Sequence, residues 1–167
     1  MRRKTISKQQ IINISYDIFC KKGIDYLTAR KISNIGKFST FPIYYNFSSI
    51  NELHDAIIDK ILEQINDHFQ YMSFQNIAQF NFEFMEFIQN KPGIGLSFFE
   101  NRYFYQKLNQ ELEKICKITL LERPKAEILD YNLSFIFSIC AYFGYTNYSS
   151  EKAHVMLQII MNSFATY

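Results

Sequence analysis

The chain contains little glycine, proline and cysteine and no tryptophan. Its 167 residues include no tryptophan, five glycines, three prolines and three cysteines. Cys20, Cys116 and Cys140 stand far apart and form no C-x-x-C pair, so neither a disulfide framework nor a redox motif is expected. We expect each cysteine to be a free thiol buried on an apolar helix face.

Long apolar runs are also missing. No stretch reaches the roughly 18 consecutive apolar residues of a membrane span. The basic start of the chain is not followed by the apolar segment of a secretory signal. We therefore expect a cytoplasmic protein without a membrane partner.

Residues that build catalytic and metal sites are scattered along the chain. His54, His68 and His154 are isolated, and none has a second ligand at the spacing of a zinc site. The sequence contains no glycine-rich phosphate loop and no nucleophile motif. It therefore predicts no enzyme, no metal and no cofactor.

Helical periodicity, by contrast, runs through the whole sequence. Apolar residues recur at intervals of three and four, and no strand-like alternation occurs. We predict an all-α fold of about nine helices. The predicted helical stretches cover residues 8–22, 28–35, a third helix after Ser39, 49–73, 75–89, 95–119, 125–145 and 150–164.

Local signals set the predicted ends of the first helices. Ser7, Thr28 and Ser39 are the expected N-caps, and Gly23 is the expected stop of the first helix. Gly36 is expected to end the second helix in a left-handed conformation. The run Lys91-Pro92-Gly93 is expected to break the chain between helices, and Pro42 to lie in the first turn of the third helix.

Charge is divided unevenly along the chain. Residues 1–50 contain nine Lys or Arg and two acidic residues, a net charge of +7, whereas residues 51–167 contain nine and fourteen, a net charge of −5. A basic N-terminal part favours contact with phosphates, and an acidic remainder is repelled by DNA. The alternative is an ordinary solvated charged surface.

Residues 28–47 predict two short helices joined by a tight turn. A unit of this kind can place its second helix in the major groove of DNA. Its apolar side is predicted to consist of Ile32, Ile35, Phe38, Ile43 and Phe47.

The spacing of eight residues in this part of the chain is specific: Phe19, Gly23, Thr28, Ile32, Ser39, Tyr44, Phe47 and Leu53. This spacing resembles the DNA-binding head of the TetR family of bacterial transcriptional regulators. The resemblance implies a three-helix head with a helix-turn-helix over residues 1–49. By architecture alone, it implies a helical effector-binding and dimerisation body over residues 50–167.

The resemblance also implies a function and partners. Members of this family are mostly repressors that bind a pseudo-palindromic double-stranded DNA operator as homodimers and leave it when a small-molecule effector binds. The chain departs from the family pattern at three positions, where Lys37 replaces the turn glycine, Phe41 a small residue and Ile50 a lysine. Phe41 either packs against a thymine methyl group or obstructs close approach to DNA. The alternative function is a helical sensor or protein-interaction module whose degenerate head binds no specific DNA.

The candidate DNA-contacting residues are Arg3, Lys4, Thr28, Arg30, Lys31, Ser39, Thr40, Phe41, Pro42, Tyr44, Tyr45 and Asn46. Tyr45 and Asn46 match outward-facing positions of the family, and an asparagine can pair with adenine through two hydrogen bonds. Tyr44 and Phe47 are expected mainly in the core, although the Tyr44 hydroxyl could reach a phosphate.

Aromatic residues gather between residues 69 and 105, where twelve occur in 37 positions. They predict a pocket for a small apolar or aromatic effector, or else a core of bulky side chains. The candidate effector-binding residues are Phe84, Phe87, Phe98, Phe99, Tyr103 and Phe135.

The last two predicted helices are apolar on more than one side. A helix of this kind is buried on both sides, either within one chain or against a second subunit. The candidate dimer-interface residues are Leu129, Leu133, Ile136, Phe143, Leu157, Ile160 and Phe164.

Overall fold

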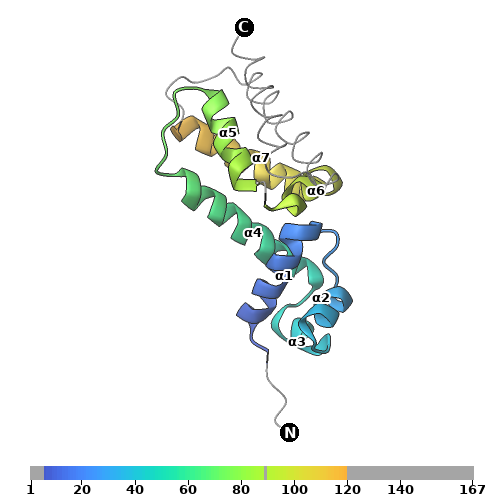
Figure 1. Ribbon diagram of the computed structural model, residues 1–167. Coiled ribbons are helices and arrows are strands. Elements are labelled where there is room, and N and C mark those ends of the chain that lie inside the picture. Colours follow the sequence, from blue (N-terminus) through green and yellow to red (C-terminus); the bar gives the residue numbers. More distant parts are fainter. Residues whose placement is uncertain (1–5, 89, 120–167) are drawn as a thin grey trace.

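The structure is a computed structural model that describes residues 6–88 and 90–119 (Figure 1). Over these residues it contains seven helices and no strand, which confirms the all-α class for this part of the chain. The helices are α1 (Lys8–Lys22), α2 (Ala29–Gly36), α3 (Phe41–Asn46), α4 (Ile50–Phe69), α5 (Ile77–Ile88), α6 (Pro92–Glu100) and α7 (Arg102–Thr119). The helices expected at 125–145 and 150–164 lie outside the described residues.

The helices form two groups joined by α4. Figure 1 shows α1, α2 and α3 at one end of the molecule, with α4 running from them towards α5 and α7. Helix α1 packs against α2, α3, α4 and α6, and α7 packs against α4 and α6. The core of the first group consists of large side chains that water does not reach, including Ile11, Phe19, Ile32, Ile43 and Phe47.

Helix α1 begins and ends where its sequence predicts. The Ser7 hydroxyl accepts a hydrogen bond from the N–H of Gln10 (3.2 Å), and the N–H of Ser7 donates to Oε1 of Gln10 (2.9 Å). At the other end the N–H of Gly23 donates to the Phe19 carbonyl (2.9 Å), with φ of 82° at Gly23. Both predicted signals are confirmed.

The end of α2 differs from the prediction by one residue. Gly36 is the last helical residue, and Lys37 takes the left-handed conformation instead, with φ of 57° and ψ of 46°. A Cβ atom on Gly36 would lie 2.1 Å from Cε1 of Phe38. A side chain at position 36 would therefore have to displace the Phe38 ring, whereas the backbone of Gly36 is helical.

Helix α3 also starts one residue later than predicted. Its N-cap is Thr40, whose carbonyl accepts from the N–H of Ile43 (3.1 Å), and Ser39 lies in the turn before it. The first turn includes Pro42, as expected.

Ile35 is not on the apolar side, because 54% of its surface is exposed. The buried side of α2 is formed by Ala29, Ile32 and Ser33. This stripe continues to Gly36, and Ile35 stands about 100° away from Gly36 around the helix axis.

Helix α4 is the continuous link between the two groups. Its N-cap Ser49 accepts from the N–H of Glu52 (3.2 Å), and the helix ends at Phe69 rather than at residue 73. Its buried stripe runs along the whole length through Leu53, Ile57, Ile61 and Ile65. One stripe therefore joins the core near α1 to the core near α5 and α7.

The stretch predicted as 95–119 forms two helices. Pro92 does not end a helix but begins α6, because a proline in the first turn needs no hydrogen-bonded N–H. Asn101 separates α6 from α7, and its side-chain oxygen accepts from the N–H of Phe104 (2.9 Å). The predicted break between two helices is confirmed, but it ends at Lys91, so Pro92 and Gly93 belong to α6 and not to the break.

Helix α6 lies directly on the end of α1. A Cβ atom on Gly93 would be 1.7 Å from the Phe19 carbonyl oxygen, so only glycine allows this approach. The buried Ser97 hydroxyl accepts from the N–H of Ile24 (2.8 Å) and donates to the Gly93 carbonyl (2.7 Å). This contact is a second connection between the first three helices and the rest of the described chain.

Candidate nucleic-acid interface

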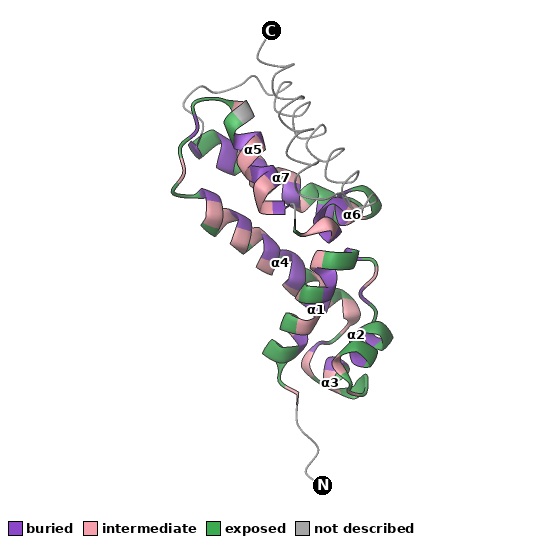
Figure 2. Ribbon diagram, in the orientation of Figure 1, coloured by how far each residue is buried: buried purple, intermediate pink, exposed green. Residues whose placement is uncertain are grey.

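The outward surface of α2 and α3 is formed by exposed polar and aromatic side chains. Figure 2 shows exposed residues along both helices, with buried residues on their inner sides. On α3, the exposed fraction is 71% for Phe41, 56% for Tyr44 and 77% for Tyr45. The unit thus presents three large rings to solvent while Ile43 and Phe47 hold it to the core.

Two of these rings form a pair. Phe41 and Tyr45 are one helical turn apart, and their ring centroids lie 5.9 Å from each other at an interplanar angle of 29°. The stacked rings form one apolar surface at the start of α3.

Tyr44 is the residue of α3 for which the expectation of a core position is wrong. Ile43 and Phe47 are one turn apart and fill the buried side, so Tyr44 is turned about 100° away from Ile43 and faces solvent. The expected core position of Phe47 is confirmed.

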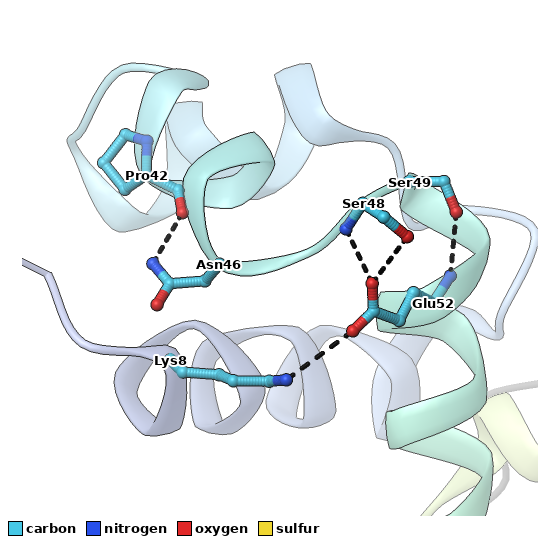
Figure 3. A network of polar contacts seen from close by, with 6 residues as sticks. All are labelled: Lys8, Pro42, Asn46, Ser48, Ser49 and Glu52. Atoms are coloured by element: carbon cyan, nitrogen blue, oxygen red, sulfur yellow. Dashed lines mark hydrogen bonds and ion pairs between the residues drawn. The ribbon is translucent and has the colours of Figure 1, made fainter.

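A network of polar contacts fixes the segment between α3 and α4 (Figure 3). The backbone N–H and the hydroxyl of Ser48 both donate to Oε2 of Glu52, at 2.6 and 2.7 Å, and the Lys8 ammonium lies 3.6 Å from Oε1. The Ser48 N–H, followed by its hydroxyl and then Lys8, lowers the pKa of Glu52. Glu52 thereby ties the end of α3 to α1.

Asn46 has a structural contact of its own. Its side-chain N–H donates to the Pro42 carbonyl within α3 at 2.8 Å (Figure 3). This hydrogen bond uses one of the two N–H groups of the amide, and the predicted pairing with adenine would use the other N–H and the side-chain oxygen.

Basic side chains are exposed on the same two-helix unit. Arg30, Lys31 and Lys37 are exposed on α2 and in the turn after it. The Lys31 ammonium stands 3.6 Å above the Tyr26 ring, and Thr28 caps α2 by accepting from the N–H of Lys31 (3.3 Å). These contacts hold the first turn of α2, and with it the basic residues, in place.

The structure therefore brings ten of the twelve candidate DNA-contacting residues into one unit made of α2, the turn and α3. Thr28, Ser39 and Thr40 are exposed, and Pro42 is half-buried. Arg3 and Lys4 lie outside the described residues.

The aromatic residues of the second group are mostly core. Phe69 of α4 is in ring contact with four phenylalanines, namely Phe74, Phe80, Phe84 and Phe87, at centroid distances from 5.4 to 6.2 Å. Phe84 and Phe98 are buried, Phe87 is half-buried under the Lys91 ammonium, and Phe99 and Tyr103 are exposed. The candidate effector-binding residues thus differ widely in exposure, and Phe135 lies outside the described residues.

The candidate dimer-interface residues, which begin at Leu129, all lie outside the described part of the chain, as does Cys140. Cys116 is buried, as expected, whereas Cys20 is half-buried; both are free thiols. Burial raises the pKa of Cys20, and it raises the pKa of Cys116 to about 12. Neither thiol is therefore activated as a nucleophile.

Within residues 6–88 and 90–119, no three His, Cys, Asp or Glu side chains are grouped so that they could hold a metal ion. None of the seven described helices has the length and apolar character needed to cross a membrane.

Sequence reasoning missed the contact between α6 and α1. The signal that could have pointed to it is the pair of small residues Gly93 and Ser97, four positions apart on a helix, a spacing that lets two backbones approach closely. Comparisons of the chain with family models, with curated proteins and with solved structures found no match.

Proposed function

We propose that the chain is a DNA-binding transcriptional regulator that responds to a small molecule. In this proposal α2, the turn and α3 form a helix-turn-helix, and α3 enters the major groove of an operator. The chain acts as a homodimer on a pseudo-palindromic site and, as a repressor of the TetR type, releases it when an apolar or aromatic effector binds.

The observation that carries the proposal is the outward surface of α2 and α3. Its aromatic residues Phe41, Tyr44 and Tyr45 are exposed, and three basic residues are exposed on the same unit, which a buried core anchors. The segment from residue 26 to residue 51 contains no acidic residue, so phosphates meet no repulsion from this segment. A short exposed helix on a rigid base is the arrangement that base contacts require.

The two connections between the helical groups support a route for the response. Helix α4 carries one buried stripe through both groups, and α6 packs on the end of α1 at Gly93 and Ser97. An effector that moves α6 or the far end of α4 would therefore move α1 and, with it, the DNA-contacting unit. The response requires that the effector bind the arrangement unable to bind DNA more tightly than the other.

The test is selection of genomic DNA fragments by the purified protein at near-physiological salt. The proposal predicts recovery of a pseudo-palindromic sequence and, for the Arg30→Gln/Lys31→Gln variant, weaker binding to it. Recovery of unrelated fragments with weak affinity would contradict the proposal.

A second candidate function is a helical sensor or protein-interaction module with a head that binds no specific DNA. The exposure of Phe41, Tyr44, Tyr45 and Ile35 favours it, since exposed apolar clusters often mark protein contacts. This candidate predicts only weak binding to duplex DNA, without sequence preference.

A further inference from the structure

The outward side of α3 is aromatic rather than charged. The helix has the sequence Phe-Pro-Ile-Tyr-Tyr-Asn and contains no Lys, Arg, Gln, Asp or Glu, the side chains that most often read base edges through hydrogen bonds. Its one amide, on Asn46, donates one of its two N–H groups to the Pro42 carbonyl. Phe41, Tyr44 and Tyr45 are the large exposed side chains that α3 offers to a partner.

Phe41 and Tyr45 are arranged as one contact surface. Both are more than two-thirds exposed, and each ring supports the other by stacking. Because the stack exists without a partner, docking it costs less side-chain entropy than docking two separate rings.

The charges around this surface select its partner. Arg30, Lys31 and Lys37 are exposed on the same unit, and no acidic residue occurs in the sequence between Asp25 and Glu52. An apolar surface on a unit with exposed basic residues and no acidic residue fits a partner that offers both anionic and apolar groups. Duplex DNA has this combination where the 5-methyl group of thymine projects into the major groove between two phosphate backbones.

We propose that Phe41 and Tyr45 together recognise thymine 5-methyl groups, with Phe41 as the specificity-determining residue. The inference rests on the proposed function and names the feature of the base that the head reads. It takes the first of the two alternatives for Phe41, contact with a methyl group rather than obstruction. It also predicts that thymines occupy fixed positions in both halves of the operator.

The experiment uses random duplex pools in which thymine is present or is replaced throughout by uracil, which lacks only the 5-methyl group. Sites are selected from the thymine pool, and their affinity is then measured with single thymines changed to uracil. We expect a loss of roughly three- to fivefold for each contacted methyl group, the size expected for exposing one methyl group to water. For Phe41→Ala, we expect the selected duplex and the duplex with uracil in place of the contacted thymine to bind equally well.

Two variants serve as controls. Tyr71→Ala removes a ring that is 89% exposed in the turn after α4, outside the contact surface, and is expected to keep the full discrimination. Phe41→Leu keeps an apolar side chain and is expected to restore part of the discrimination. Since Phe41 is exposed, Phe41→Ala is expected to melt at the wild-type temperature.

The outcomes separate this inference from the proposed function. Specific sites that bind equally well with uracil, or that keep their discrimination in Phe41→Ala, would overturn the reading of methyl groups and leave the regulator intact. Tighter binding by Phe41→Ala would show that the ring obstructs DNA. Failure of the wild-type protein to select any site would overturn both.

Discussion

At the scale of single residues, Lys37 takes the left-handed backbone conformation that is usual for glycine. This conformation, with φ of 57°, is strained for a residue with a side chain. We predict that Lys37→Gly is more stable to urea than Lys37→Ala by about 1 kcal/mol, because both variants lose the charge and only one relieves the strain. Equal stability would mean that the turn carries no strain.

Glu52 gives a prediction about pH. Its pKa is lowered in the folded protein by the Ser48 N–H, the Ser48 hydroxyl and Lys8, so its contribution to stability is fully present above the unfolded pKa of about 4.3. That contribution is lost as pH falls through the lower, folded pKa. We expect Glu52→Gln to unfold more easily than the wild type at pH 6, and the difference to shrink towards pH 3.

Urea titrations at several pH values measure this difference. Glu63→Gln, an exposed carboxylate farther along α4, is the matched control. A difference between Glu52→Gln and the wild type that stays constant down to pH 3 would contradict the assigned cause of the shift.

Residues whose position depends on local chemistry were predictable from the sequence. Ser7, Gly23 and Thr28 act within one turn of the chain, and each has the predicted role. The predictions for Ile35 and Tyr44 are wrong because successive helical residues stand about 100° apart, so a position one residue away from the buried stripe can face solvent.

At the scale of helices, the contact between α6 and α1 is the feature most sensitive to mutation. Gly93→Ala would place a methyl group against the Phe19 carbonyl and the Gly23 N–H, both backbone atoms that cannot turn away. We predict a loss of about 3 kcal/mol in the free energy of unfolding, as the two helices must separate. A loss below 0.5 kcal/mol would show that α6 does not rest on α1 in solution.

Ser97 tests the same contact through its hydrogen bonds. Ser97→Ala leaves the buried N–H of Ile24 without its acceptor, which costs about 1–3 kcal/mol. Ser73→Ala, in an exposed segment, is the control and is expected to change stability by less than about 0.5 kcal/mol. If the two variants melt at the same temperature, the Ile24 N–H has another acceptor.

The sequence could not have predicted that α6 contacts the end of α1. The residues Ile24 and Ser97 are separated by 73 positions, and the sequence signals for helices act over a few residues only. Pro92 is as usual in the first turn of a helix as at a break, and Gly93 allows the close approach of α6 to α1.

At the scale of the whole molecule, the all-α class could be predicted because apolar residues recur with helical spacing in every described helix. The candidate DNA-contacting unit could also be located, since charge and spacing both lie in the first fifty residues. The outward surface itself could not be drawn from the sequence. It depends on how many of the three rings of α3 pack into the core. In the structure none of them does, and Phe41, Tyr44 and Tyr45 are all exposed.

For the whole molecule, we propose that the basic N-terminal part binds duplex DNA specifically while the acidic remainder stays away from it. The most direct measurement is the dissociation constant for a duplex selected by the protein, determined from about 50 to 200 mM salt beside an unrelated duplex. We predict tighter binding to the selected duplex at every salt concentration and a steep loss of affinity with salt, by roughly a thousandfold or more for six to ten phosphate contacts. Equal affinity for the two duplexes, or affinity that salt leaves unchanged, would contradict the claim.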